Sequence, residues 1–541
     1  MSTSAEPLSR RGLGRLSSIS NTYSRQILLF AGFVGLVVAL LVTPTIPNSS
    51  SKSTTSTSPV PSGITPATTP QAPGLTVAGI RCGPGVRQLP WSHYSPWCQP
   101  AWHGNNGGAT APGVTATTIT LTYRLASSSE LSLLYALIPK WAIGTNQETI
   151  RTLNAYIKVF NHYFELYGRH VVLKPFMGQG NFINEDVGKG APQAQADAVT
   201  AKSMGAFADM SLIDSSLLYN DDLVAQHVIA FSLYTETASW FAKRAPYVYT
   251  PGPDLSKAAV AAAAIVGKEM SGLPAIYAGK ALTHKKRVIG ILYMENNPQV
   301  IAAKDLVVSD LSHYGVHPAI QVGYSFDLST LESQAQSAIA QFKSAGVTTV
   351  LYIGTDPVTP IFLTKAADEQ NYYPEWYIQP GFAITTGLSP LVQLLPTSQT
   401  AHLFAEGLPL RSDQEAVQTW RMAHVSGKIE PLYPLIYSSL LQFFDGLQAA
   451  GPYLTPQSFS EGLARLPHST PGGMFGSWSF SAGTIDPVSD FHIEKYDPSI
   501  ISQADGRPGA FIACNGGRGY SYANGAKNLP AHTQPYCPVK P

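Results

Sequence analysis

The sequence predicts an α/β protein with two doubly wound, Rossmann-like lobes. Two observations support this prediction. Short runs rich in β-branched residues alternate with longer stretches of helical spacing, first over residues 113–285 and again over 286–400. Polar loops also follow the predicted strands. Strands and helices that alternate at these lengths indicate parallel βαβ units, whose ligands lie beyond the carboxyl ends of the strands.

The second series shows the pattern more clearly. Its predicted strands are 287–293 (RVIGILY), 319–323 and 347–353 (VTTVLYI), and its predicted helices are 299–315 and 331–345. A glycine ends each helix, as is typical of a helix C-terminus. The polar loops MENNP (294–298) and GTDP (354–357) follow the first and third strands. We expect both loops to lie where a ligand would be held.

The first series has the same organisation. Its predicted strands are 117–123 (TTITLTY), 171–176, 206–212 and 228–233, and its predicted helices are 152–167, 191–204 and 256–270. The helix over 152–167 has an aromatic stripe at helical spacing, which indicates a buried face rather than a cofactor site. Polar loops follow three of the strands, at 124–130, 213–216 and 234–237.

Length, charge and motifs limit the function. At 541 residues the chain is too long for one hydrophobic core. Its net charge is +1, from 35 basic and 34 acidic residues, so nothing suggests nucleic acid or another polyanion as a partner. The sequence lacks zinc-type cysteine pairs, a dinucleotide fingerprint, a phosphate loop and hydrolase signatures. We therefore expect no metal, no cofactor and no catalysis.

The N-terminal part predicts export. Residues 1–26 are basic, and residues 27–46 form an apolar segment whose length lies between a signal-peptide core and a spanning helix. Both interpretations stay open, so the body is either anchored to the cell membrane on its outer side or secreted. No acidic residue lies close to the apolar segment, and the positive-inside rule keeps the N-terminus in the cytoplasm. Residues 47–74 are rich in Ser, Thr and Pro and predict a disordered tether.

Four cysteines predict two disulfides in an exported protein. Three pairings are possible, and we favour Cys82–Cys98 and Cys514–Cys537, because each closes a short local loop. The first pair would lie in a loop-rich preface, residues 75–112, whose aromatic residues either form a binding platform or pack on the neighbouring domain. The alternative to disulfides is four free buried thiols.

Five segments follow one another in a distinctive order: GVTATTITL (113–121), LNAYIKVFNHYFELYGRHVVL (153–173), FDLSTLESQAQSAIAQFKSAGVTTVLYIGT (326–355), IYSSLLQFFDGLQAAG (436–451) and GGMFGSWSFSAGTIDPVSDFHIEKY (472–496). In this order they resemble the type I periplasmic binding proteins, in particular the branched-chain amino acid and amide substrate-binding subunits of ABC importers. The cysteine-containing preface and tail look like the actinobacterial branch of this family.

The resemblance implies two lobes joined by crossover hinge strands and closing on a small ligand. It assigns 113–285 to lobe 1, 286–400 to lobe 2, 401–455 to a return into lobe 1, and 456–541 to a closing hairpin of lobe 2 with a disulfide-bonded tail. It also implies a set of ligand-binding residues in the loops after the strands. These are Ser211, Asp214, Ser215, Ser232, Tyr234 and Thr235 in lobe 1, and Tyr293, Glu295, Asp356 and Phe382 in lobe 2.

Two alternatives remain open for this set. The serines and threonines of lobe 1 could instead cap helices. In lobe 2, the loop Gln379-Pro380-Gly381-Phe382 lacks the acid that many relatives carry there, which puts an α-amino acid ligand in doubt. Tyr293 and Phe382 suggest an apolar or aromatic component instead.

The resemblance implies a binding protein that delivers a small polar or amphipathic solute, such as an amino acid, an amide or a small organic acid, to ABC permease subunits. The alternative is a membrane-tethered receptor or sensor with no role in transport. The lack of a cysteine after the apolar segment excludes a lipoprotein anchor and favours this alternative.

Overall fold

The protein is described from a computed structural model over residues 73–212, 214–233, 236–378, 391–407, 414–470, 476–501, 506–523, 526 and 528–537. The predicted cytoplasmic segment 1–26, the membrane segment 27–46 and nearly all of the tether lie outside the described residues. Among the residues that are described, no helix has the length and apolarity needed to cross a bilayer.

Five parallel strands form the sheet of the first lobe, in the order β2-β1-β3-β4-β5. The strands are β1 (Thr118–Leu125), β2 (His170–Met177), β3 (Ala208–Asp209), β4 (Ile229–Phe231) and β5 (Val248–Tyr249). β1 is buried along almost its whole length, as expected of a central strand covered on both faces. The predicted strands at 206–212 and 228–233 are therefore present but shorter than predicted.

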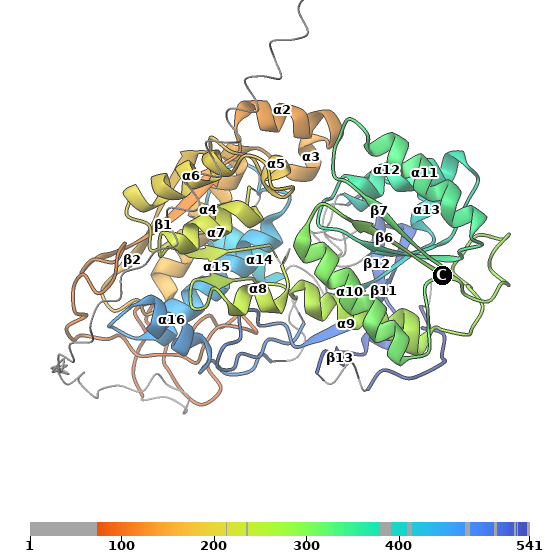
Figure 1. Ribbon diagram of the computed structural model, residues 1–541. Coiled ribbons are helices and arrows are strands. Elements are labelled where there is room, and N and C mark those ends of the chain that lie inside the picture. Colours follow the sequence, from red (N-terminus) through yellow and green to blue (C-terminus); the bar gives the residue numbers. More distant parts are fainter. Residues whose placement is uncertain are drawn as a thin grey trace, which may run out of the picture. The chain divides into compact units, whose positions relative to one another are not determined.

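Helices from two parts of the chain cover this sheet. The early helices are α2 (Ser128–Leu137), α3 (Lys140–Ile143), α4 (Asn146–Tyr163), α5 (Phe182–Glu185), α6 (Ala191–Ser203), α7 (Leu217–Ala225) and α8 (Ala238–Ala242). The late helices are α14 (Gln414–Met422), α15 (Tyr433–Ala450) and α16 (Pro456–Leu463). Figure 1 shows α14 and α15, in blue, among the early helices of this lobe.

Aromatic packing explains why the late helices return. Phe160 of α4 meets Tyr437 and Phe444 of α15 with ring centroids 5.8 and 5.1 Å apart. Phe459 of α16 meets Tyr249 of β5 at 5.1 Å. The aromatic stripe of α4 is thus core, as its spacing predicted.

The second sheet has the order β7-β6-β8-β9-β10-β11-β12, with β13 paired to β11. Its parallel strands are β6 (Ile289–Met294), β7 (Ile320–Tyr324), β8 (Thr349–Ile353), β9 (Glu375–Ile378) and β10 (Leu403–Gly407), and its antiparallel strands are β11 (Asp490–Ile501), β12 (Pro508–Ala513) and β13 (Tyr520–Ser521). The main helices on it are α9 (Leu255–Ala263), the π-helix η1 (Ala264–Glu269), α10 (Pro298–His313), α11 (Leu331–Ser344), α12 (Thr359–Glu369) and α13 (Thr397–Thr400). Short 3₁₀ turns lie at η2 (Val392–Leu394) and η3 (Asn515–Gly517).

Both lobes share one topology. In each, the first strand lies between the second and the third, and the fourth and fifth follow outward from the third. The chain therefore winds in both directions from the first strand, and the switch points lie between β1 and β3 and between β6 and β8. Ligands of open α/β sheets bind beyond the strands at such points. The predicted loops MENNP and GTDP follow β6 and β8, on both sides of the second switch point.

Several predicted boundaries differ from the structure. Helix α9 and η1 pack on α10 of the second lobe, with Gly267 against Leu311, although residues up to 285 were predicted in lobe 1. Strand β10 pairs in the second sheet although it lies in the predicted return to lobe 1, and α16 packs on lobe 1 although it lies in the predicted closing hairpin. The antiparallel pair that closes the sheet is β11–β12, which begins after most of the predicted 472–496 hairpin.

A polar loop was predicted over 124–130, but the structure has other elements there. Arg124 lies inside β1 with its side chain fully buried, and Ser127 caps α2 by accepting a hydrogen bond from the Glu130 backbone N–H. The serine-rich sequence predicted a loop, but serine is common both in turns and at helix N-termini. Residue type alone therefore does not distinguish the two.

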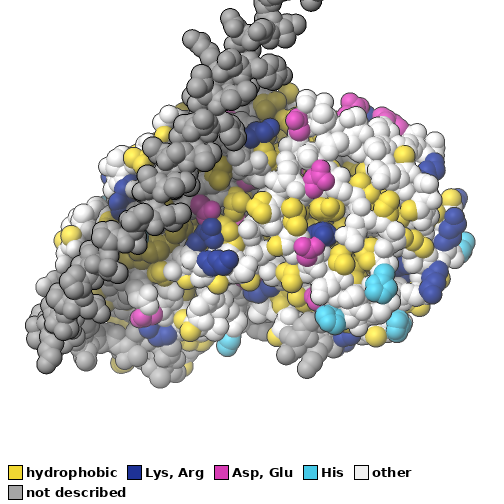
Figure 2. All heavy atoms as spheres, viewed as in Figure 1, with side chains coloured by type: hydrophobic (Ala, Val, Ile, Leu, Met, Phe, Trp, Pro, Cys, Tyr) yellow, Lys and Arg dark blue, Asp and Glu magenta, His cyan; other side chains and the backbone are white. Residues whose placement is uncertain are grey.

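Both favoured disulfides are present, Cys82–Cys98 and Cys514–Cys537. The preface aromatics pack on the first lobe: the ring of Trp91 meets that of Tyr163 at 4.9 Å, and its Nε1 donates to Thr419 Oγ1 at 3.0 Å. On the face shown in Figure 2, charged side chains are few and scattered among apolar and neutral ones.

Candidate functional site

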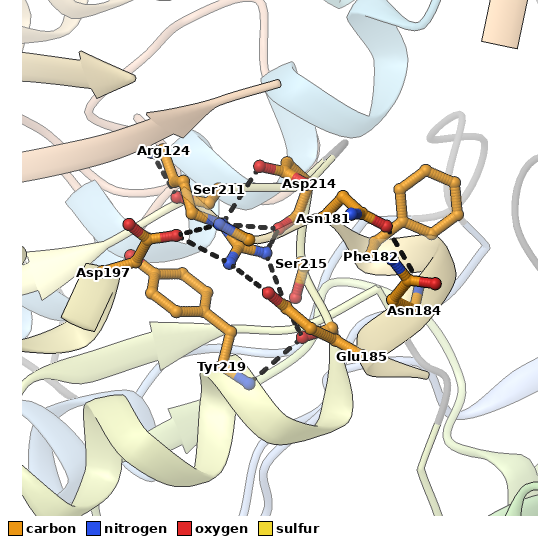
Figure 3. A network of polar contacts seen from close by, with 12 residues as sticks. Arg124, Asn181, Phe182, Asn184, Glu185, Asp197, Ser211, Asp214, Ser215 and Tyr219 are labelled. Carbon is orange, nitrogen blue, oxygen red and sulfur yellow. Dashed lines mark hydrogen bonds and ion pairs between the residues drawn. The ribbon is translucent and has the colours of Figure 1, made fainter. Parts of the chain in front are cut away.

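The first switch point is filled by a buried ion cluster centred on Arg124. Its guanidinium contacts Glu185 with two bonds of 3.0 and 2.9 Å, Asp197 at 3.3 Å and Asp214 at 3.0 Å. It also lies 3.9 Å from the ring centroid of Tyr219. Figure 3 shows these side chains converging from β1, α5, α6, α7 and the loop after β3.

Acidic groups outnumber the cation in this cluster. Burial raises the pKa of Asp214 well above its usual range, which Arg124 opposes and the neighbouring Glu130 reinforces. Burial likewise raises the pKa of Glu130 to about 7. Two adjacent carboxyl groups that cannot both ionise hold a proton between them. The cluster thus stabilises its charge internally, and Arg124 is already occupied by carboxylates of the protein itself.

The predicted serines of lobe 1 bond within the lobe. Ser211 Oγ donates to Asp209 and accepts the backbone N–H of Arg124. Ser232 Oγ donates to Glu236 Oε2 at 2.6 Å. Ser215 exchanges hydrogen bonds with Asn220 at 3.0 and 3.2 Å and is half-buried. Helix α7 is capped by Ser216, the next residue, rather than by any of the predicted serines.

The second switch point is organised by Asp356, in the loop after β8. Its carboxylate accepts from the hydroxyls of Tyr324 and Tyr352 at 2.6 and 2.9 Å, and from the backbone N–H groups of Val358 and Thr359 at 3.0 and 2.6 Å. The loop needs Gly354, because a Cβ there would collide with both tyrosine hydroxyls. Asp356 therefore fixes the start of α12 and places a buried, hydrogen-bonded carboxyl group at the strand ends.

Two further predicted residues lie at the end of β6, Tyr293 within the strand and Glu295 directly after it. Glu295 is exposed and accepts from Ser325 Oγ at 3.1 Å. Tyr293 is half-buried, with Lys304 Nζ 5.1 Å from its ring centroid. The three remaining predicted residues, Tyr234, Thr235 and Phe382, lie outside the described residues.

Hydrogen bonds join the strand ends of the two lobes. Asn297, the N-cap of α10, donates from Nδ2 to the carbonyl oxygen of Asp186 at 3.4 Å. Gln299 Oε1 accepts from the Thr237 hydroxyl at 2.8 Å and from its backbone N–H at 3.3 Å. The loops after β2 and β4 of the first lobe thus face the loop after β6 of the second.

The space around these contacts is strongly acidic. Burial, together with the nearby charges of Glu236, Glu185 and Asp356, raises the pKa of Asp186 to about 8. Asp356 belongs to the second lobe and the other three to the first, so carboxyl groups of both lobes act on one another. Such a region favours a ligand group that is positive or donates hydrogen bonds.

Sequence reasoning missed four residues of this region: Arg124, Asp186, Glu236 and Asn297. Signals exist for three of them. Arg124 is a charged residue inside a β-forming run, and Asn297 precedes a proline at a helix start, which is a typical N-cap pattern. Glu236 lies in the polar loop 234–237 that follows a predicted strand, whereas Asp186 has no distinguishing local pattern.

Comparison with known proteins agrees with this architecture. No protein-family model matches the sequence, and no curated protein does either. Solved structures match by fold. A fatty acid ABC transporter substrate-binding protein from Thermomonospora curvata aligns with a TM-score of 0.55 at 14% identity, over 80% of this chain and 100% of that one.

Two matches come from Rhodopseudomonas palustris. A solute-binding protein of an ABC transporter in complex with 4-hydroxybenzoate aligns with a TM-score of 0.51 at 13% identity, over 73% of this chain and 95% of that one. Another, in complex with 3,4-dihydroxy benzoic acid, aligns with a TM-score of 0.51 at 11% identity, over 75% and 98%. The chain therefore has the two-lobed α/β fold of ABC-transporter substrate-binding proteins.

Proposed function

We propose that this chain is an extracytoplasmic solute-binding protein, not an enzyme, that captures a small ligand between its lobes and delivers it to an ABC importer. The observation that carries the proposal is the pairing of two switch points, each at the carboxyl ends of a doubly wound sheet, joined by Asn297–Asp186 and Gln299–Thr237 hydrogen bonds. A ligand that contacts both lobes stabilises such a closed arrangement by its differential affinity for it.

The acidic residues at the strand ends of the two lobes favour one type of head group among the ligand classes named above. Asp186, Glu236 and Asp356 make the region rich in carboxyl groups, of which Asp186 gains its charge only as the pH rises through about 8, and Arg124 is already paired with three carboxyl groups. A head group with an ammonium or amide N–H fits this field, as in an amino acid or an amide. The structurally similar R. palustris proteins were solved with hydroxybenzoates, so aromatic acids form the comparison set.

The test is the pH dependence of ligand binding, measured by isothermal titration with amino acids, amides and hydroxybenzoates. The pKa of Asp186 is raised to about 8, so its charge appears as the pH rises through that value. A cationic head group should therefore bind more tightly above about pH 8 than below it, and a carboxylate without an amine should bind less tightly. If hydroxybenzoates bind and neither amino acids nor amides do, the proposal of an ammonium or amide head group is wrong.

Two variants sharpen this measurement. Asp186→Asn should flatten the pH dependence near 8, because the titrating group is gone while its backbone contact to Asn297 stays. Asp310→Asn is the matched control, since Asp310 lies at the opposite end of α10 from the strand ends. Equal pH profiles for Asp186→Asn and the unaltered chain would show that Asp186 does not face the ligand.

The second candidate function is a tethered receptor without a transport role. It is favoured by the missing lipoprotein cysteine and by the anchor interpretation of residues 27–46, one of the two that stay open. Uptake of a bound ligand, measured after deletion of the gene, separates the two functions. Loss of uptake supports the importer role, and unchanged uptake of every ligand that binds supports the receptor.

A further inference from the structure

A basic strip runs along α4 and along the last turn of α14 with the segment that follows it. Helix α4 contributes Arg151, Lys158 and His162, at spacings that place them on one helix face. The second segment contributes Arg421, His424 and Lys428. All except half-buried Arg151 are exposed. The acidic residues of these two stretches are Glu148, Glu415 and Glu430, and the last two are buried.

A groove lies within this strip. Its volume is about 580 Å³, and it is open to solvent. Its lining is amphipathic: the cationic or cationisable side chains are Lys158, His162, Arg421 and His424, and the less polar ones are Val159, Tyr163 and Met422. Among the described residues that line it, none is acidic. A small hydrophobic cluster that includes Val159 and Ala423 lies beneath it.

The groove lies away from the ligand cleft. Helix α4 follows β1 and precedes β2, so its last turn, with His162 and Tyr163, lies near the amino ends of the strands. All of the lining residues belong to the first lobe. Lobe closure therefore leaves the groove intact, and a partner could bind there whether or not a ligand is held. The preface, which packs beside it through Trp91 and Tyr163, contains no Asp or Glu.

We propose that the α4/α14 groove is a docking site for an acidic, partly apolar peptide segment of a protein partner. Charge complementarity is the main argument, because the described lining of the groove has four basic or titratable side chains and no acidic one. The apolar floor adds a place for an aliphatic side chain next to the carboxylates. The groove is concave, which fits a peptide better than the flat surface of a membrane.

The chain itself offers no suitable occupant in its N-terminal part. Residues 1–26 carry Arg10, Arg11, Arg15 and Arg25 against a single acid, Glu6. Residues 47–72 carry one charge, that of Lys52. Both segments therefore lack the negative charge that a basic groove attracts.

The test measures fluorescence anisotropy of labelled synthetic peptides with the purified full-length chain. One peptide alternates Glu and Leu, one alternates Gln and Leu, and one contains Glu alone. The Glu/Leu peptide should bind best, and its binding should weaken as salt rises from about 0.05 M to about 0.5 M. Equal binding of the Gln/Leu peptide, or no binding of the Glu/Leu peptide, would overturn the proposal.

Variants locate the binding. Arg421→Glu should weaken binding of the Glu/Leu peptide by about tenfold, because it removes one attraction and adds one repulsion. Met422→Gln should remove the preference for Glu/Leu over Glu alone. Lys243→Glu is the matched control, since Lys243 is exposed on the same lobe but outside the groove. An equal loss with Lys243→Glu would assign the effect to net charge and overturn the proposal.

Three further arms distinguish other occupants. Binding of phosphatidylglycerol vesicles without binding of the Glu/Leu peptide would make the groove a lipid site. Displacement of the peptide by a synthetic copy of residues 47–72 would make it a site for the tether. A dimer in sedimentation that Arg421→Glu dissociates would make it a contact between copies. Each result overturns the proposal, whereas unchanged ligand affinity in Arg421→Glu shows that the groove acts separately from the ligand cleft.

Discussion

A buried acidic side chain destabilises the folded protein at a pH at which it would ionise, and Glu494 is an example. Glu494 of β11 is 1% exposed, and its Oε2 has no hydrogen-bond partner. Burial raises its pKa to about 8. The group is therefore protonated at neutral pH in the folded protein and ionised in the unfolded chain. Above about pH 8 the carboxyl group ionises either inside the core, which is unfavourable, or in the unfolded chain. The free energy of unfolding therefore falls.

Glu494→Gln should stabilise the protein at high pH. Glutamine has the same shape and never ionises, so the free energy of unfolding should rise by roughly 2 kcal/mol at about pH 9 and change little at about pH 5. Urea denaturation at the two pH values measures it. Glu461→Gln, at an exposed position of α16, is the control and should show no such pH-dependent gain. Equal effects at both pH values would contradict a titrating Glu494.

Arg124 shows how much depends on side-chain geometry rather than charge alone. Its planar guanidinium meets three carboxylates and a tyrosine ring at once. A lysine ammonium carries the same charge but cannot form the paired bonds to Glu185.

Arg124→Lys should lower the free energy of unfolding by about 3 kcal/mol, because buried carboxylates lose their hydrogen bonds. Arg244→Lys is the matched control: Arg244 pairs with Asp221 and covers Trp240 in a partly exposed place, so about 1 kcal/mol or less is expected there. Denaturation at neutral pH measures both. If Arg124→Lys lowers the free energy of unfolding no more than Arg244→Lys does, the positive charge stabilises the cluster without the guanidinium geometry.

The close approach of helices α15 and α16 determines how substitution of Gly462 affects stability. Helices α15 and α16 approach so closely at Gly462 that an added Cβ would lie 2.6 Å from backbone atoms of Ala449 and Ala450. In an open helix, alanine would be favoured over glycine by about 1 kcal/mol. Here the neighbouring backbone cannot move aside as a flexible side chain would.

Gly462→Ala should therefore destabilise the protein, by about 1–3 kcal/mol, against its helix propensity. Thermal unfolding measures the change. Glu461→Ala, one residue earlier and exposed, should be neutral or slightly stabilising. A raised Tm for Gly462→Ala would mean that α16 can shift away from α15.

At the scale of the whole molecule, buried acids set the pH dependence of stability. Burial raises the pKa of several carboxyl groups to about 7 or about 8, namely Glu130, Glu269 and Glu415, and Asp486 and Glu494. Each pKa is higher in the folded state than in the unfolded chain. Between about pH 4 and pH 8 the folded protein therefore binds more protons, and its stability falls as the pH rises.

The free energy of unfolding should therefore be larger at about pH 5 than at about pH 8.5. This is the opposite of a protein whose carboxylates are mostly held in ion pairs. Urea denaturation across this range measures the slope, and Glu494→Gln should reduce it. A stability that rises between the two values would contradict the raised pKa values of these groups.

Much of the architecture follows from local sequence. The alternation of β-branched runs with helical spacing predicted α10, α11 and the strands β6 and β8 within a few residues, since these elements are long and strongly patterned. The short loop between each pair of cysteines favoured the observed disulfides. The boundaries of the lobes failed where the chain crosses between them, because an element's periodicity does not say which sheet it covers.

Within the candidate site, the sequence by itself placed the loops after β3, β4, β6 and β8 at the strand ends, because parallel strands all end at one edge of their sheet. Only the tertiary structure decided which side chains meet there. Arg124 and Asp214 are 90 residues apart, and Asn297 and Asp186 are 111 apart. Whether residues so far apart in the sequence are buried together, and which charges they meet, depends on how whole helices and loops pack. Local sequence spacing does not determine that packing.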